Sequence, residues 1–228
     1  MPFLFWDWTL ILLVPALILT AYAQFKVSST FKKYNKVPSG RGLTGAQGAR
    51  MLLDSAGLNN VGIELIGGRL SDNYDPRSKT LRLSEDVGNS NSLAALGVAA
   101  HEAGHALQDA QGYAPMKVRS TLVPAANIGS NAGFILFFVG LLFGRNPVLM
   151  NLGIVLFSVA VAFTVITLPV EINASRRALA MLSDKGILVS QEVDGARKVL
   201  QAAALTYLAA ALMAILNLVR LIVISRNR

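Results

Sequence analysis

Four long apolar stretches dominate the pattern of hydrophobic and polar positions along the chain. They run from about residue 3 to 25, 122 to 143, 148 to 170 and 202 to 224. A helix needs about 20 mostly apolar residues to cross a bilayer, and each stretch is long enough. The pattern therefore predicts a mainly α-helical integral membrane protein with about four transmembrane helices.

A different pattern fills the polar segment between the first two stretches. Residues 44–57 show apolar positions at helical spacing, bounded by residues that favour helix ends. Two short alternating runs follow at 62–70 and 79–84, and the turn-forming residues between them predict a β-hairpin or a small sheet. Another helix is expected at about 92–109, because Ser92 is a good N-cap residue.

Composition agrees with a membrane protein. Hydrophobic residues make up 53% of the chain and charged residues 15%, against about 25% charged residues in soluble domains. A net charge of +8 could indicate binding to nucleic acid. However, the basic residues flank apolar stretches and do not alternate with aromatic residues, so the expected partner is a lipid bilayer and not nucleic acid.

The distribution of Lys and Arg predicts the orientation in the membrane. Segment 26–121 holds twelve of these residues and segment 171–201 holds five, whereas the loop at 144–147 holds only Arg145. Basic residues concentrate on the cytoplasmic side of membranes, so both rich segments are expected there. We attribute the basic run at 26–36 to this topology signal, with contact to anionic lipid as the alternative.

Glycines four residues apart mark the second stretch, at Gly129 and Gly133 and again at Gly140 and Gly144. Small residues at this spacing let helices approach closely in lipid. We expect them to pack within the chain. Contact with a second copy in a homo-oligomer, or with a membrane partner protein, is the alternative.

The candidate chemistry is concentrated in His101-Glu102-Ala103-Gly104-His105, which contains both histidines of the chain. Residues four apart share one face of a helix, so the two imidazoles can bind the same zinc ion. The sequence predicts one Zn2+ per chain, with His101 and His105 as ligands and Glu102 as the catalytic base. Glycine inside a helix costs about 1 kcal/mol relative to alanine, so Gly104 suggests close approach by a neighbouring helix or by substrate.

The third protein ligand is expected to be a carboxylate. A catalytic zinc site keeps three protein ligands, and the chain has no other histidine and no cysteine. Glu171 is the strongest candidate, because it is the only acid near the ends of the second and third stretches. Asp109 lies one turn beyond His105, too far along the helix axis to close a compact site. The other acids considered precede the zinc helix: Asp72, Asp75, Glu85 and Asp86.

The expected mechanism follows from zinc chemistry. Zinc lowers the pKa of a bound water to about 7, and Glu102 accepts the proton and passes it to the leaving amine. The tetrahedral oxyanion needs a hydrogen-bond donor, and the unranked candidates are Tyr74, Asn173, Arg176 and Arg177. An exposed strand beside the zinc helix could bind a peptide substrate by strand addition.

Longer motifs carry a resemblance to known families. His-Glu-x-x-His with a distant Glu is the gluzincin arrangement, and Glu171-x-x-Ala174 resembles the Glu-x-x-Ala-Asp motif of HtpX-type and CAAX prenyl membrane proteases. Ser175 stands where those proteins have the Asp that supports a zinc histidine, so the sequence leaves open whether residue 175 makes that contact. Over nearly its whole length the chain is similar to the YugP-type membrane zinc metallopeptidases. The residues that carry this similarity are the N-terminal anchor, Tyr74-Asp75-Pro76-Arg77, Leu81–Ser84, His101–Gln108 and Leu168–Arg177.

The resemblance implies a bacterial membrane-bound zinc peptidase in the plasma membrane. The expected architecture has four transmembrane helices and a cytoplasmic zincin-like catalytic region with a small sheet. Its parts are an anchor at 1–25, the catalytic region at 26–121, a transmembrane hairpin at 122–170, a cytoplasmic helical segment at 171–201 and a final transmembrane helix at 202–228. The alternative function is a catalytically silent zinc-binding membrane scaffold or partner protein.

Overall fold

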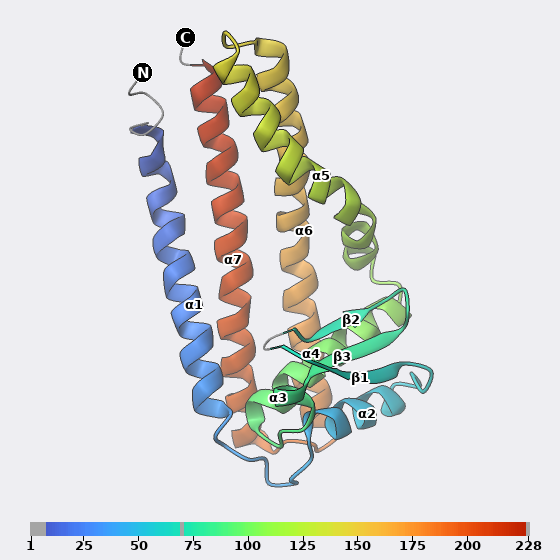
Figure 1. Cartoon of the computed structure of the whole chain (residues 1–228). Coiled ribbons are helices and arrows are strands. Elements are labelled where there is room, and N and C mark those ends of the chain that lie inside the picture. The colour runs from blue at the N-terminus through green and yellow to red at the C-terminus, as the bar shows by residue number, and fades with distance from the viewer. Residues whose placement is uncertain (1–7, 69–70, 227–228) are drawn as a thin grey trace. The chain divides into compact units, whose positions relative to one another are not determined.

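A computed structural model describes residues 8–68 and 71–226 of the chain. Helices make up most of it, beside one small sheet (Figure 1). Residues 3–7, where the first apolar stretch was predicted to begin, lie outside the described residues. The elements in chain order are η1 (Trp8–Leu13), α1 (Val14–Tyr34), α2 (Gly45–Ser55), β1 (Gly62–Ile66), β2 (Asn73–Asp75), β3 (Thr80–Ser84), α3 (Glu85–Gly88), α4 (Leu93–Ala110), α5 (Ala114–Leu142), α6 (Pro147–Asp184) and α7 (Ser190–Arg226).

Among the described residues, four helical segments are long and apolar enough to cross a membrane: Trp8–Tyr34, α5, α6 and α7. The chain is therefore a mainly α-helical membrane protein, as predicted. The helices extend beyond the apolar stretches, and α6 has 38 residues. At a rise of 1.5 Å per residue α6 is about 57 Å long, whereas the hydrocarbon core of a bilayer is about 30 Å thick. Part of α6 must therefore lie outside the hydrocarbon.

The chain divides into two compact units. One contains Lys117–Pro169 together with the chain up to Ala23 and from Thr206 onward, and the other contains Gln24–Met116 and Val170–Leu205. All candidate metal ligands belong to the second unit.

In the first unit, glycines bring the backbones of α5 and α6 into contact. A Cβ atom on Gly133 would lie 2.7 Å from the backbone nitrogen of Phe157, and Gly129 and Gly140 also face α6. The predicted packing of these glycines within the chain is confirmed. Gly144 is different, because it has a φ of +72° in the turn after α5 and no neighbour within 4 Å of its Cβ position.

The second unit contains the three-stranded sheet, in the order β1-β3-β2. The strands predicted at 62–70 and 79–84 are present as β1 and β3, although residues 69–70 lie outside the described residues. Of the two predicted arrangements, the small sheet is confirmed and the hairpin is not, because β1 and β3 run parallel. The strand antiparallel to β3 is β2, which forms from residues expected to be a turn. The 67–79 connection is long enough for the crossover that parallel strands require.

Helix α4 lies in the core of the second unit and contacts α2, α3, β2 and β3. Ser92 caps it by accepting a hydrogen bond from the Ala95 backbone N–H, as predicted. The segment around the α6–α7 turn packs against the same core, which includes Leu182, Ile187 and Ala196. The helix, turn and helix expected after residue 171 are therefore present, and they cover the helix that carries the two histidines.

Candidate metal centre

The candidate site lies where α4 crosses α6. A Cβ atom on Gly104 would lie 2.6 Å from the carbonyl oxygen of Ala174, closer than real Cβ atoms come to another backbone. The close approach expected at Gly104 is thus made by a neighbouring helix. Because Ala174 has a small side chain as well, the two helices meet at backbone distance, and this brings Glu171 of α6 beside the two histidines of α4.

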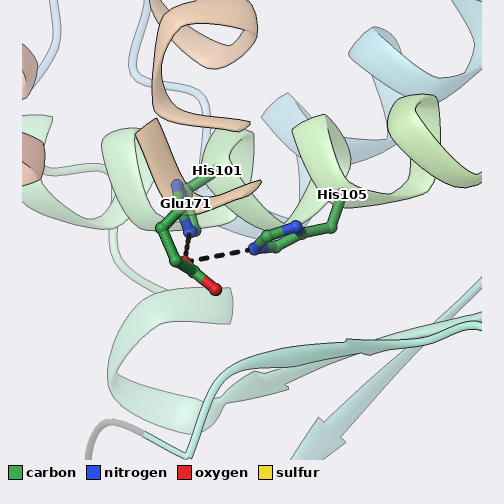
Figure 2. Close-up of side chains that lie close together, drawn as sticks. All are labelled: His101, His105 and Glu171. Atoms are coloured by element: carbon green, nitrogen blue, oxygen red, sulfur yellow. Dashed lines mark hydrogen bonds and ion pairs between the residues drawn. The ribbon is translucent and has the colours of Figure 1, made fainter. Parts of the chain in front are cut away.

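Three side chains converge at this crossing (Figure 2). The Oε2 atom of Glu171 lies 3.1 Å from Nε2 of His101 and 3.4 Å from Nε2 of His105. Donor atoms bound to one tetrahedral zinc at about 2 Å lie about 3.3 Å apart, so these distances fit such an ion. Within the described residues, this is the one cluster of three His or acidic side chains that could hold a metal.

The cluster is shielded from solvent. The exposed fractions of the side chains are 12% for His101, 8% for His105 and 3% for Glu171. Burial alone would lower the pKa of His105. The hydrogen bond to Glu171 and the charges of Glu102 and Glu171 outweigh it, so that the pKa of His105 is raised. The same negative surroundings favour a cation at this place.

Gln108, fully buried on α4, fixes the orientation of His105. Its Nε2 donates to the Val170 carbonyl, 2.8 Å away, and to Oδ1 of Asn173, 2.9 Å away. Its Oε1 lies 3.0 Å from Nδ1 of His105. Because an amide oxygen can only accept, His105 must donate from Nδ1, and this leaves the Nε2 lone pair for a metal.

Ser175 has the corresponding role at His101. Its Oγ lies 3.1 Å from Nδ1 of His101, so a hydroxyl stands where the related motif has a carboxylate. The sequence left this contact open, and the structure shows that it is made. One helical turn after Glu171 brings residue 175 onto the face of α6 that meets α4. With Nδ1 bonded to Ser175, the Nε2 atom of His101 is left for a metal.

Glu102, the predicted base, is buried, with 7% of its surface exposed. Its Oε2 accepts a hydrogen bond of 3.0 Å from the backbone N–H of Tyr74. Because this N–H bonds to Glu102 and not to β3, it lies on the outer side of β2, which is an edge strand of the sheet. The structure therefore places the outer edge of β2 directly against Glu102.

The phenol of Tyr74, predicted as an oxyanion donor, is occupied elsewhere. Its hydroxyl donates to Oδ2 of Asp109, 2.8 Å away, and Lys79 also donates to this carboxylate. Burial, then the hydrogen bond to Asp109, raises the pKa of Tyr74 above its usual range. Asp109 holds β2 and is not part of the metal cluster, in line with its expected distance from the site.

The other candidate donors occupy different places. Asn173 accepts hydrogen bonds from Gln108 and from Nε of Arg177, at 2.9 and 2.7 Å. Arg177 also donates to Gln111. These two residues therefore extend the polar chain that starts at His105. Arg176 is exposed, and in the described part of the chain it makes no hydrogen bond or ion pair.

Comparison with known proteins fits this geometry. The family model described as "Putative neutral zinc metallopeptidase" matches residues 9–226. The chain belongs to this family. It is also 46% identical over 216 residues to the "Putative membrane protease YugP" of Bacillus subtilis (strain 168), covering 95% of this chain and 96% of the relative. No solved structure matches the chain.

Membership in the zinc-metallopeptidase family agrees with the resemblance found in the sequence. Sequence reasoning had identified the residues that converge, but it gave no role to Gln108. A signal was present, because Gln108 follows His105 by three residues and is a polar side chain on a helix that is otherwise largely apolar.

Proposed function

We propose that the chain is a zinc-dependent endopeptidase of the gluzincin type at the cytoplasmic surface of a bacterial plasma membrane. The observation that carries the proposal is the convergence of His101, His105 and Glu171 beside the buried Glu102. The family and relative described above support it. In this assignment, residues 26–121 and 171–201 lie on the cytoplasmic side and form the catalytic region.

Each residue of the site has a distinct task in this proposal. His101, His105 and Glu171 would hold zinc, which supplies a Lewis acid that polarises a peptide carbonyl and acidifies a water. Glu102 accepts the proton from the attacking water and delivers it to the leaving amine. Gln108 holds His105 in the tautomer that leaves Nε2 unprotonated, and Ser175 orients the imidazole of His101 through Nδ1.

The proposed substrate is a peptide segment that pairs with the outer edge of β2. The outward N–H of Tyr74 is bonded to Glu102. A substrate carbonyl that pairs at this position would accept the hydrogen bond in its place. The Glu102 carboxylate would then be released for proton transfer at the moment when a peptide is present.

The test uses purified full-length protein in detergent. We expect about one zinc per chain by elemental analysis, together with cleavage of casein. Glu102→Gln should keep the zinc but lose cleavage at least about a hundredfold, as expected for removal of a general base. Glu85→Gln is the matched control, because Glu85 is exposed on α3, and it should cleave normally.

The alternative is a silent scaffold, and the same experiment separates it from an enzyme. Zinc-loaded wild type that cleaves neither casein in detergent nor any protein in native membranes would favour the scaffold. Equal cleavage by wild type and Glu102→Gln would refute the assigned role of Glu102.

A further inference from the structure

A groove between α1 and α7 collects positive charge that the metal centre does not use. Its volume is about 610 Å³, within the range of roughly 300–1,000 Å³ that small-molecule sites occupy. All its lining residues belong to the second unit.

The walls of the groove are two regular helix faces. On α1 the lining residues include Lys26, Ser29, Thr30 and Lys33, and on α7 they are Lys198, Gln201, Ala202 and Leu205. Both sets repeat at i, i+3, i+4 and i+7, which places each set on one side of its helix. The groove is therefore built from ordered helices and not from loops.

One end of the groove is closed by a tight contact. A Cβ atom on Gly195 of α7 would lie 3.1 Å from two ring carbons of Tyr34 on α1. Tyr34 itself lines the groove, and Nζ of Lys33 lies 5.5 Å from the centroid of its ring. The approach of α1 to α7 at Gly195 thus holds these groups in fixed positions.

The charge in the groove is not balanced by the protein. Lys26, Lys33 and Lys198 line it, and no Asp or Glu does. In the described part of the chain, none of these three lysines forms an ion pair. A bound anion would relieve the repulsion among them, and Thr30 and Gln201 supply neutral hydrogen-bond donors.

The groove lies where the sequences of two candidate membrane helices change between apolar and polar residues. α1 is apolar before Gln24, and α7 is largely apolar from Ala202 onward. Lipid headgroups occupy the level at which such helices leave the hydrocarbon. Ala202 and Leu205 give the groove an apolar end, which the first carbons of a lipid acyl chain can contact.

We propose that this groove binds the phosphate-bearing headgroup of an anionic phospholipid. A soluble phosphate ester carries the same anionic group, but it has no apolar part that would contact the apolar end of the groove. A topology signal explains an excess of lysines on one side of the membrane, but it does not explain why three of them converge on one groove.

The test measures binding of fluorescent phosphatidylglycerol to the full-length protein in detergent. The groove variant combines Lys26→Gln, Lys33→Gln and Lys198→Gln, and we expect its affinity to fall about tenfold or more. The matched control combines Lys32→Gln, Lys36→Gln and Lys185→Gln. It removes the same charge at exposed positions outside the groove and should bind as wild type does.

A second variant distinguishes loss of the binding site from loss of folding. Ser29→Trp keeps all charges and fills the groove from an exposed position, so it should also weaken binding. Phosphatidylcholine and soluble glycerol phosphate are the competitors, and neither should displace the probe as unlabelled phosphatidylglycerol does.

Three results would overturn the proposal. Equal losses in the groove variant and its control would show only general attraction to surface charge. Unchanged binding in the groove variant and in Ser29→Trp would place the lipid elsewhere. Displacement by glycerol phosphate as effective as that by the lipid would make a soluble anion the ligand.

Discussion

Gln108 shows how much of the metal centre depends on one neutral side chain. It has no exposed surface, and its amide group makes three hydrogen bonds within the site. Both amide hydrogens are used by acceptors, so the oxygen is left for His105. A residue at this position that cannot accept a hydrogen bond would leave the imidazole free to rotate or to take the other tautomer.

We therefore predict that Gln108→Ala weakens zinc binding by about 10- to 100-fold, the usual effect of removing an outer-sphere partner of a ligand. Competition with a fluorescent zinc chelator measures the change. Gln191→Ala is the control, because Gln191 is exposed at the start of α7. Unchanged affinity in Gln108→Ala would mean that His105 is oriented in another way.

Ser175 permits a test in both directions. Ser175→Ala removes the partner of Nδ1 on His101, and we expect weaker zinc binding, by up to about tenfold. Ser175→Asp should bind zinc at least as well as wild type, because a charged acceptor forms a stronger hydrogen bond with Nδ1–H. The same chelator competition ranks the zinc affinities of the three proteins. Weaker zinc binding by Ser175→Asp than by Ser175→Ala would contradict the prediction.

The sequence contains enough to predict the ligands but not all of their supports. His101, Glu102 and His105 share a short motif, and the absence of cysteine left a carboxylate as the third ligand. Gln108 is close in sequence and could have been included. Ser175 lies 74 residues from His101, so its contact depends on how α4 and α6 cross, which no local pattern encodes.

At the scale of elements, the crossing of α4 and α6 decides whether the site exists. Gly104 and Ala174 set the distance between the two helices, and the donor atoms of Glu171 and the histidines match only at that distance. Close backbone contact leaves no room for adjustment, since packed interiors tolerate little added volume.

Gly104→Ala should therefore separate the helices. We expect about 1–3 kcal/mol of destabilisation, typical of overpacking, and loss of bound zinc. Thermal unfolding and elemental analysis of the purified protein measure both effects. Gly67→Ala is the control, because a Cβ on Gly67 meets nothing within 4 Å. A Gly104→Ala protein with normal zinc content would show that the crossing can adapt.

Strand β2 is held to α4 through Tyr74, and this contact predicts a pH dependence. The pKa of the Tyr74 hydroxyl is raised in the folded protein. The contribution of this hydroxyl to stability is therefore complete below about pH 10, the pKa of an unperturbed tyrosine. The contribution is lost as the pH rises above that value, because the unfolded chain then ionises more easily.

The measurement compares wild type with Tyr74→Phe in chemical unfolding between neutral pH and pH above 10. We expect the free-energy difference between the two proteins to shrink as the pH rises. A difference that stays constant would show that Tyr74 ionises equally easily in the folded and unfolded chains.

The elements differ in how well the sequence predicts them. The long helices follow from apolar stretches and caps, which are local. The strands β1 and β3 follow from alternation, but alternation does not specify the direction of pairing. The short β2 was missed because its three residues lie between turn-forming residues and depend on contacts with β3 and Glu102.

At the scale of the molecule, two distant parts of the sequence build one centre. His101 on α4 and Glu171 on α6 are 70 residues apart in the sequence. Helix α5 and the first part of α6 lie between them. Both ligand-bearing segments belong to the same compact unit. Both must therefore lie on the same side of a membrane.

The orientation can be measured directly, because the chain has no cysteine to cause background. A cysteine introduced in place of Lys185, in the turn between α6 and α7, should not react with a membrane-impermeant thiol reagent in intact cells. It should react once the cells are opened and the reagent reaches the cytoplasmic side. A cysteine at Phe143, in the turn between α5 and α6, should react from outside with a membrane-impermeant reagent in intact cells. The reverse pattern would place the metal centre outside the cytoplasm.

The donor atoms of the centre also determine which chemical damage it can resist. In the proposed site, imidazole nitrogens and a carboxylate oxygen would bind the metal, and the chain contains no thiol. Peroxides inactivate many zinc sites by oxidising cysteine thiolates to sulfenic and higher acids. This centre offers them no such target, so it should keep its metal under oxidative stress that strips zinc from cysteine-ligated proteins.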